Sequence, residues 1–296
     1  MARCGQRSHR VRVRDPYPEP VHVSAPASSA NLGPGFDCLA LAVDLPFELA
    51  TAADAPPEYL VVDERHPAAV AFVAAGGDPA VELRWRSPIP PGRGLGFSGA
   101  ARVAGAHLAG LLDGLDEATA RDGAFRVAAD LEGHPDNAAA SAYGGLTVAA
   151  GEQVLSVPVP ADVALLAWSP PTTTSTNSSR ATLPAEVSME DAVFSLGRAA
   201  LWVAAMATGE LSVLRTACQD RLHQPARLGA REDSRAVLEH LLGDDSVLAA
   251  WLSGSGPTVA ALVPAGAEHA ALIDGLPGEG HSRVVPISAS GCAARG

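Results

Sequence analysis

The chain has 296 residues, enough for two domains, and its composition (47% hydrophobic, 18% charged) is typical of a globular protein. The net charge of −12 argues against a nucleic-acid-binding protein, whose binding face should be basic, and no apolar segment is long enough to span a membrane. All 21 cationic residues are arginine. This excludes a Walker lysine, a Schiff-base lysine and a lysine general base, so any phosphate or carboxylate must be held by arginine, backbone amides or a metal ion.

Residues 1–20 are predicted to be a disordered basic leader, because they contain several arginines followed by prolines. A targeting or nucleic-acid role for this leader is an alternative, but it lacks the apolar segment of a secretory signal. The four cysteines are scattered, with no C-x-x-C pair, and the nine histidines show no H-E-x-x-H spacing. These patterns predict reduced thiols in a cytoplasmic protein rather than a disulfide framework or a zinc site.

The next segment is predicted to be a strand that begins at Val21 and breaks at Pro26. A polar loop rich in glycine and proline follows it and extends to Asp37. Asn31 in this loop offers donors and an acceptor, and Asp37 offers a fixed negative charge. The residues alone leave two interpretations open: a tight turn capped by its own side chains, or a loop that binds a polar ligand.

A glycine-rich loop between a predicted strand at 81–86 and a helix of small residues is the organising motif of the chain. Gly92, Gly94 and Gly96 alternate in this loop, so its backbone can adopt positive φ and approach a ligand closely. Ser98 stands at the start of the helix, where free N–H groups and the positive end of the dipole attract anions. We therefore predict an anion site, most naturally for phosphate, with a simple turn as the alternative. The loop fits neither the Walker pattern nor the dinucleotide fingerprint.

A second polar cluster lies at the junction of two predicted helices, 116–131 and 136–143. It contains Glu132, His134, Asp136 and Asn137. A carboxylate at this position is suited to hold Mg²⁺ while phosphate and water oxygens complete an octahedral shell. Capping of the second helix by Asp136, with Glu132 on the surface, explains the same residues equally well.

The remaining elements are predicted from the periodicity of their apolar residues. The strands lie within 47–62 and at 144–150, 161–168, 248–252, 259–263 and 282–287. The helices lie at 66–75, 189–207, 211–218, 231–242 and 268–276. A domain boundary is expected between residues 151 and 160, and a hydroxyl-rich loop at 172–184 carries Arg180, a residue type suited to anion capture. Helices that back an antiparallel sheet place the chain in the α+β class.

Several segments resemble, in order, motifs of the GHMP kinase superfamily, and within it those of the homoserine kinases. The matching segments are 26–37, 90–98, 131–137, Thr176 with Arg180 and Leu183, 220–227 and 253–258. The resemblance extends from Val21 to Val285. It implies a two-domain GHMP kinase fold, with an N-terminal domain at 21–155 similar to ribosomal protein S5 domain 2 and a ferredoxin-like C-terminal domain at 156–296. Members are commonly dimers, so a homodimer is expected.

The resemblance also implies an activity, the transfer of the γ-phosphate of ATP to the side-chain hydroxyl of L-homoserine on the threonine pathway. Ser98 and Glu132 would bind Mg²⁺. The catalytic residues would be Glu132, Ser98, Asn31 and Arg180. The phosphates of ATP would be held by Pro91, Gly92, Arg93, Gly94, Leu95, Gly96, Phe97, Ser98 and Gly99. The amino-acid substrate would be held by Asn31, Asp37, His134, Asn137, Thr176, Arg180 and Arg227. In this set, the arginines suit the substrate carboxylate and Asp37 suits its ammonium group.

The phosphate loop departs from the family pattern, which normally has the sequence Gly-Leu-Gly-Ser-Ser-Ala. Phe97 and Gly99 replace a serine and an alanine here. Phe97 removes a hydroxyl donor and adds a bulky ring, and Gly99 weakens the first helical turn by roughly 0.5–1 kcal/mol. The departure motivates two alternatives: a kinase of a related amino alcohol, such as threonine or a specialised-metabolite precursor, and a catalytically silent amino-acid-binding paralogue.

Overall fold

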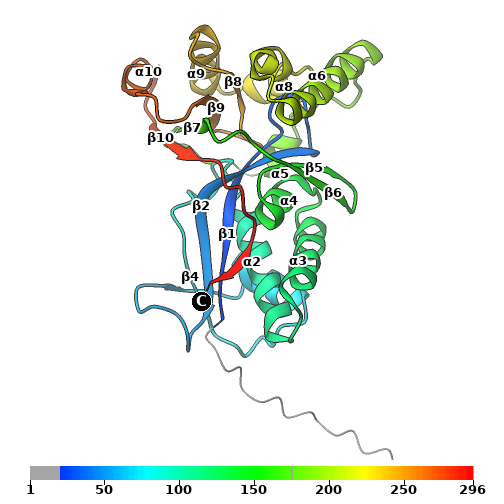
Figure 1. The fold of residues 1–296 in the computed structure, drawn as a ribbon, viewed down its shortest axis with the longest axis vertical. Helices are drawn as coiled ribbons and strands as arrows, with labels where there is room; N and C mark the ends of the chain where they lie inside the picture. The colour runs from blue at the N-terminus through cyan, green and yellow to red at the C-terminus, as the bar shows by residue number, and fades with distance from the viewer. Residues whose placement is uncertain (1–20, 175, 296) are drawn as a thin grey trace, which may run out of the picture.

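The computed structural model describes residues 21–174 and 176–295, except the side chains of Thr176 and Asn177. The predicted leader, residues 1–20, lies outside the described residues. Figure 1 shows an elongated molecule with one sheet in each half and helices packed around both. The combination of helices and antiparallel sheets confirms the predicted α+β class.

The first sheet has seven strands in antiparallel pairing, in the order β11-β1-β2-β4-β3, and β5 pairs with both β2 and β6. The strands are β1 (His22–Ala30), β2 (Leu39–Thr51), β3 (Leu60–Val61), β4 (Leu83–Arg86), β5 (Leu146–Ala150), β6 (Gln153–Val157) and β11 (Ala293–Arg295). The long β1–β2 pair is the central part of this half (Figure 1). One end of this pair carries the polar loop, residues 31–38, that connects the two strands.

The helices of this half are α1 (Pro67–Ala74), α2 (Phe97–Leu112), α3 (Glu117–Glu132) and α4 (Asp136–Tyr143). α2 and α4 lie against β1 and β2, and α1 and α3 pack against α2 (Figure 1). The small residues of α2 allow this close packing, because a Cβ atom at Gly105 would overlap the backbone carbonyl of Ala68 in α1. α2 is buried at the centre of these helices. Its N-terminus faces the end of the sheet where Ser28 lies.

The prediction that the first strand breaks at Pro26 is wrong. β1 continues to Ala30, and its pairing with β2 shifts register between Pro26 and Ala27. Such a bulge tolerates a proline, which cannot donate a ladder hydrogen bond. The polar loop therefore starts at Asn31, five residues after Pro26, and β2 begins at Leu39 instead of within 47–62.

The second sheet has four antiparallel strands in the order β10-β7-β9-β8. They are β7 (Val163–Ser169), β8 (Ala249–Leu252), β9 (Val259–Pro264) and β10 (His281–Pro286). The helical segments of this half are α5 (Thr176–Arg180), α6 (Met189–Thr208), η1 (Leu211–Val213), α7 (Leu214–Ala217), α8 (Gln224–Leu228), α9 (Glu232–Gly243) and α10 (Ala270–Asp274). One face of this sheet shares a core with the first half through Leu165, Trp251 and Leu262, and the other packs on α9 and α10. No described helix is long and apolar enough to cross a bilayer.

The last described residues return to the first half. Ser288 exchanges hydrogen bonds with Ala42 and Gly145, and the Cys292 amide donates to the Ser141 carbonyl at 2.9 Å. β11 then pairs with β1 (Figure 1, red). The domain boundary at residue 155 stays a prediction; the two sheets separate after β6, and β11 belongs to the first sheet although it comes last in the chain.

Candidate active site

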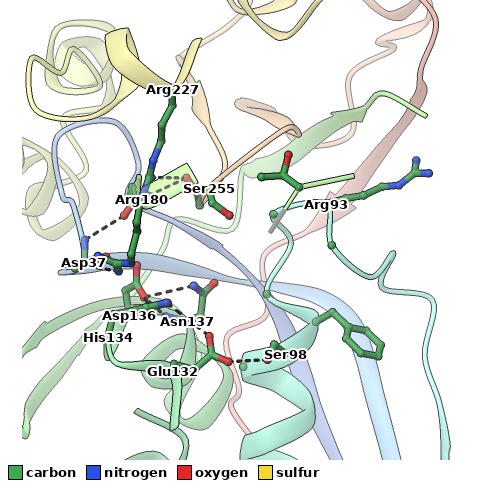
Figure 2. A pocket seen from close by; sticks show the side chains of 18 residues that line it. Asp37, Arg93, Ser98, Glu132, His134, Asp136, Asn137, Arg180, Arg227 and Ser255 are labelled. Carbon is green, nitrogen blue, oxygen red and sulfur yellow. Dashed lines mark hydrogen bonds and ion pairs between the residues drawn. The ribbon is translucent and has the colours of Figure 1, made fainter. Parts of the chain in front are cut away.

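A polar cleft lies between the two halves of the molecule, where the ends of β1, α2 and α4 face α5, α8 and the turn after β8 (Figure 2). Segments that are far apart in the chain supply its walls. The lining residues are Asn31, Asp37, Gly92, Arg93, Gly94, Gly96, Phe97, Ser98, Gly99, Glu132, His134, Asp136, Asn137, Thr174, Arg180, Arg227, Gly254 and Ser255. Most residues of the predicted site therefore meet in one place.

The glycine-rich loop forms part of the wall of this cleft. Gly92, Gly94 and Gly96 have φ of 67°, 81° and 68°, as their alternation predicts. Two carbonyls of the loop are already paired: that of Gly94 accepts from Ser253 Oγ at 2.6 Å, and that of Gly92 accepts from the Thr174 amide at 2.9 Å. Gly96 is the N-cap of α2 and, as a glycine, has no side chain to accept from the first amides of the helix. The first amides of α2 are thus available to an anion.

Ser98 and Glu132 form a pair of oxygen donors at the start of α2. Ser98 Oγ donates to Glu132 Oε1 at 2.7 Å, although the residues are far apart in the chain. Neighbouring ligands of an octahedral Mg²⁺ site are about 2.9 Å apart when each lies 2.0–2.1 Å from the ion. Two hard oxygen donors at this spacing fit Mg²⁺, with phosphate and water oxygens to complete the shell. Arg102, one turn further along α2, ion-pairs with Glu132 and donates to Ser98 Oγ at 2.6 Å.

The segment from Glu132 to Asn137 connects this pair to the other half of the cleft (Figure 2). Gly133 ends α3 in the left-handed conformation, with φ of 76°, and Asp136 begins α4. The buried Asp136 carboxylate accepts from His134 Nδ1 at 2.6 Å and from the Asn137 amide at 2.8 Å. Asp136 therefore connects both ends of the turn. The alternative that it caps α4 is wrong, because Asp136 is the first residue of the helix and the N-cap is Pro135.

The other half of the cleft carries opposite charges side by side. Arg180 Nη2 lies 2.7 and 2.9 Å from the two carboxylate oxygens of Asp37. Arg227 lies close by, 3% exposed, and burial, reinforced by the positive charge of Arg180, lowers the pKa of its guanidinium. A free α-amino acid carries an ammonium group and a carboxylate on neighbouring atoms. Such a zwitterion can replace the Arg180–Asp37 contact by two ion pairs of its own.

The loop that presents Asp37 is held in a strained conformation. Asn31 and Asp37 have φ of 73° and 56°, values that cost non-glycine residues free energy and often occur at ligand sites. Asn31 Nδ2 donates to the Gly254 carbonyl at 3.0 Å, and Asn31 Oδ1 accepts from the Asp37 amide at 3.1 Å. Arg227 Nη1 also donates to the Gly254 carbonyl, at 3.0 Å. One carbonyl of the turn after β8 thus fixes both the Asp37 loop and the buried arginine.

The Phe97 ring packs among other rings of the first half. It makes edge-on contacts with Phe47, His66 and Trp85, with centroid separations of 5.6, 5.8 and 5.5 Å. Phe47 and Trp85 are stacked on each other. Burial lowers the pKa of His66, whose Nδ1 accepts the Ala68 amide, so the cluster is uncharged. Phe97 borders the cleft, but its ring belongs to the packing of the first half.

Some residues of the predicted site do not line the cleft. Leu95 is buried in the core and Pro91 is exposed outside the cleft, so neither side chain faces the cleft. The Thr176 side chain lies outside the described residues. Four residues line the cleft without having been assigned a role in it from the sequence: Asp136, Thr174, Gly254 and Ser255. Arg102 contacts Ser98 and Glu132 without lining the cleft and was not expected either. Asp136 and Arg102 were detectable, the first from its place in the segment 132–137 and the second from its spacing of four residues from Ser98.

Comparisons with known proteins show the family to which the chain belongs. Residues 62–145 match the family model of the GHMP kinases N terminal domain. Homoserine kinase of Thermus thermophilus is 41% identical over 256 residues, which span 82% of this chain and 87% of the relative. Homoserine kinase of Moorella thermoacetica is 39% identical over 266 residues, which span 81% and 86%.

Solved structures of kinases superpose on most of this chain. The crystal structure of homoserine kinase from Cytophaga hutchinsonii superposes with a TM-score of 0.74 at 23% identity, over 96% of this chain and 100% of that one. A putative homoserine kinase from Listeria monocytogenes superposes with a TM-score of 0.71 at 28% identity, over 93% and 99%. A mevalonate kinase shares the fold at 11% identity, with a TM-score of 0.64.

Proposed function

This chain belongs to the homoserine kinase family of the GHMP kinases, and from that premise we propose that it transfers the γ-phosphate of ATP to the side-chain hydroxyl of L-homoserine, in threonine biosynthesis. The observation that carries the proposal is the composition of the single cleft. An anion site and an oxygen-donor pair stand at one end of it, and paired opposite charges stand at the other. A site that binds a nucleoside triphosphate together with a small zwitterion requires this combination.

At the phosphate end of the cleft, the residues bind ATP and orient its phosphates. The amides at the start of α2 hold the β- and γ-phosphates against the positive end of the helix dipole. Ser98 and Glu132 hold Mg²⁺, which neutralises phosphate charge when it is bound. Arg93 is engaged elsewhere, because its guanidinium donates to the carbonyls of Pro170 and Pro171 at 2.8 and 3.0 Å. It thereby fastens the loop to the second half of the molecule.

At the substrate end, the residues fix the acceptor. Asp37 takes the ammonium group, and Arg180 and Arg227 take the carboxylate. Asn31, His134 and Asn137 complete the surroundings, and Thr176 is part of the proposed set by resemblance. With no lysine in the chain, positioning of the hydroxyl in line with the γ-phosphate is what these residues contribute to the reaction.

Two observations bear on the alternatives. The Ser98–Glu132 pair is assembled and the Phe97 ring packs with Phe47 and Trp85, which argues against a silent paralogue. The charged groups that select a zwitterion do not by themselves distinguish homoserine from threonine, since both carry the same two charges and a hydroxyl. We favour homoserine as the acceptor because the chain belongs to the homoserine kinase family.

A substrate panel tests the proposal. Release of ADP is measured with the full chain, Mg·ATP and homoserine, threonine or serine, each at several concentrations. We expect homoserine to give the highest kcat/KM. Absence of turnover with homoserine, while calorimetry still shows binding of Mg·ATP, would overturn the assignment, and turnover of threonine alone would transfer it to a related amino alcohol.

Two further properties belong to the proposal. We propose a homodimer, supported by Met189, Val193 and Leu196, which are 79%, 60% and 70% exposed and recur on one side of α6. Light scattering after gel filtration measures the mass and checks this. We also propose a cytoplasmic location, supported by the free thiols of Cys38, Cys218 and Cys292.

A further inference from the structure

Arg102 contacts both members of the proposed metal pair but does not line the cleft. Its Nη1 donates to Ser98 Oγ at 2.6 Å and forms an ion pair with Glu132 Oε1. The side chains of Arg102 and Glu132 are 21% and 9% exposed, so solvent screens their interaction only weakly. Nothing in the proposed transfer of phosphate requires an arginine at this position.

We infer that Arg102 is a positioning residue that orients the Ser98 hydroxyl and weakens the binding of a bare divalent ion at Ser98 and Glu132, so that the ion is held tightly only together with nucleotide phosphates. The inference rests on the metal site of the proposed function and names a residue outside it. It has two parts, one about hydrogen-bond geometry and one about charge.

The geometric part follows from what a hydroxyl can do. A serine hydroxyl has one hydrogen and two lone pairs. The hydrogen of Ser98 goes to Glu132 Oε1, and one lone pair accepts from Arg102. One lone pair remains, and Ser98 itself lines the cleft, so that lone pair is available to an ion there. Arg102 thus leaves Ser98 a single direction in which to bind a metal ion.

The charge part follows from the shared carboxylate. Arg102 and a metal ion held by Glu132 would be two cations that share one carboxylate, in a place where the side chains of Arg102 and Glu132 are largely out of water. The guanidinium therefore reduces the negative potential that a bare dication would experience, and the two cations repel each other. Nucleotide phosphates bring negative charge to the same place and offset this repulsion.

A purely structural role would be indicated by full pairing of the guanidinium with the surrounding protein, which is not observed. Arg102 Nε is buried and has no hydrogen-bond partner among the described residues. Replacement of Arg102 should therefore change the affinity of the metal site as well as the stability of the fold.

The test measures binding of Mn²⁺, a paramagnetic substitute for Mg²⁺, by electron paramagnetic resonance on the full chain without homoserine. Titrations without nucleotide compare the natural protein with Arg102→Met, Arg102→Lys and Glu132→Gln. Arg235→Met is the matched control, because Arg235 is an exposed helical arginine on α9, outside the cleft. The titrations are repeated with a non-hydrolysable ATP analogue. If Arg102→Met does not fold, Arg102→Gln, which retains a donor for Ser98 Oγ, takes its place.

Without nucleotide, we expect Arg102→Met to bind Mn²⁺ at least tenfold more tightly than the natural protein, and Arg102→Lys and Arg235→Met to match the natural protein. With the ATP analogue, the gain of Arg102→Met should shrink to less than threefold. A folded Arg102→Met that binds bare Mn²⁺ no more tightly than the natural protein would overturn the inference, as would an equal gain in Arg235→Met.

Failure of the inference and failure of the proposed function give different results. Binding of Mn²⁺ is measured without acceptor and without turnover, so it does not depend on which amino acid is phosphorylated. If Glu132→Gln binds bare Mn²⁺ as well as Arg102→Met does, the metal site itself is wrongly placed, and the inference falls with it. If homoserine is not phosphorylated but Arg102→Met shows the tenfold gain, the inference stands and only the acceptor is wrong.

Discussion

Replacement of Phe97 by serine restores the residue that the family's phosphate loop normally carries, and the structure predicts that this will harm the protein. The Phe97 ring contacts the rings of Phe47, His66 and Trp85. Each such aromatic pair contributes about 0.5–1.5 kcal/mol beyond the area it buries. Complete removal of a buried Phe side chain costs about 3–5 kcal/mol, and Phe97 is only partly buried. We therefore expect Phe97→Ser to lower the free energy of unfolding by about 2 kcal/mol.

The assay compares thermal unfolding with kinetics on the same preparations. A loss of about 2 kcal/mol corresponds to a melting temperature that is lower by roughly 4–8 °C. Because the ring packs against Phe47, His66 and Trp85, kcat/KM for ATP should not rise in Phe97→Ser. Phe97→Leu is the matched control, since it keeps apolar volume without the ring, and it should lose less stability.

One combination of results would refute this reasoning. If Phe97→Ser has an unchanged melting temperature and a kcat/KM for ATP at least tenfold higher, the ring lies where the nucleotide must bind. The natural loop would then be a lesion in the phosphate site, and the silent-paralogue alternative would gain support.

Two other predictions follow from the site and from the buried histidines. Arg227→Met should raise KM for homoserine by about 30-fold or more, because loss of one side of a desolvated charge pair costs about 2–5 kcal/mol, while KM for ATP changes little. Steady-state kinetics with each substrate varied in turn measure both constants. An effect on KM for ATP alone would contradict the assignment. Burial lowers the pKa of His107 and of His223 below the unfolded value of 6.5, so the unfolded chain binds protons more readily. The contribution of these histidines to the free energy of unfolding is then fully present above about pH 6.5 and falls on acidification by up to about 1.4 kcal/mol per pH unit for each histidine. Urea denaturation at several pH values measures this free energy. A free energy of unfolding that rises on acidification would exclude the prediction.

The parts of the site that sequence motifs predicted are those in which local chemistry determines local shape. Gly92, Gly94 and Gly96 adopt positive φ because a glycine adopts it without steric cost, so their alternation predicts the loop. The segment from Glu132 to Asn137 likewise carries its own turn residue, Gly133, and its own helix start. The α+β class also followed from the order of the predicted elements, which fits helices that back an antiparallel sheet.

The parts that sequence motifs did not predict depend on distant partners. The direction of the Phe97 ring is set by Phe47 and Trp85, which lie on β2 and β4, and no local pattern contains that information. The contact between Arg180 and Asp37 joins the two halves of the chain, so it was expected only as two separate charges. The passage of β1 through Pro26 depended on a register shift against β2, which residue periodicity does not show.

The return of β11 to the first sheet affects how the chain acquires its structure. β1 is paired along one side with β2. On its other side the first three residues, His22–Ser24, pair with residues 293–295, which a ribosome adds after all the other described residues. During synthesis that edge stays open, and an open edge invites pairing with other chains. A fragment cut at residue 155 would retain the same open edge, so expression of the first half alone should favour aggregation over an independently stable domain.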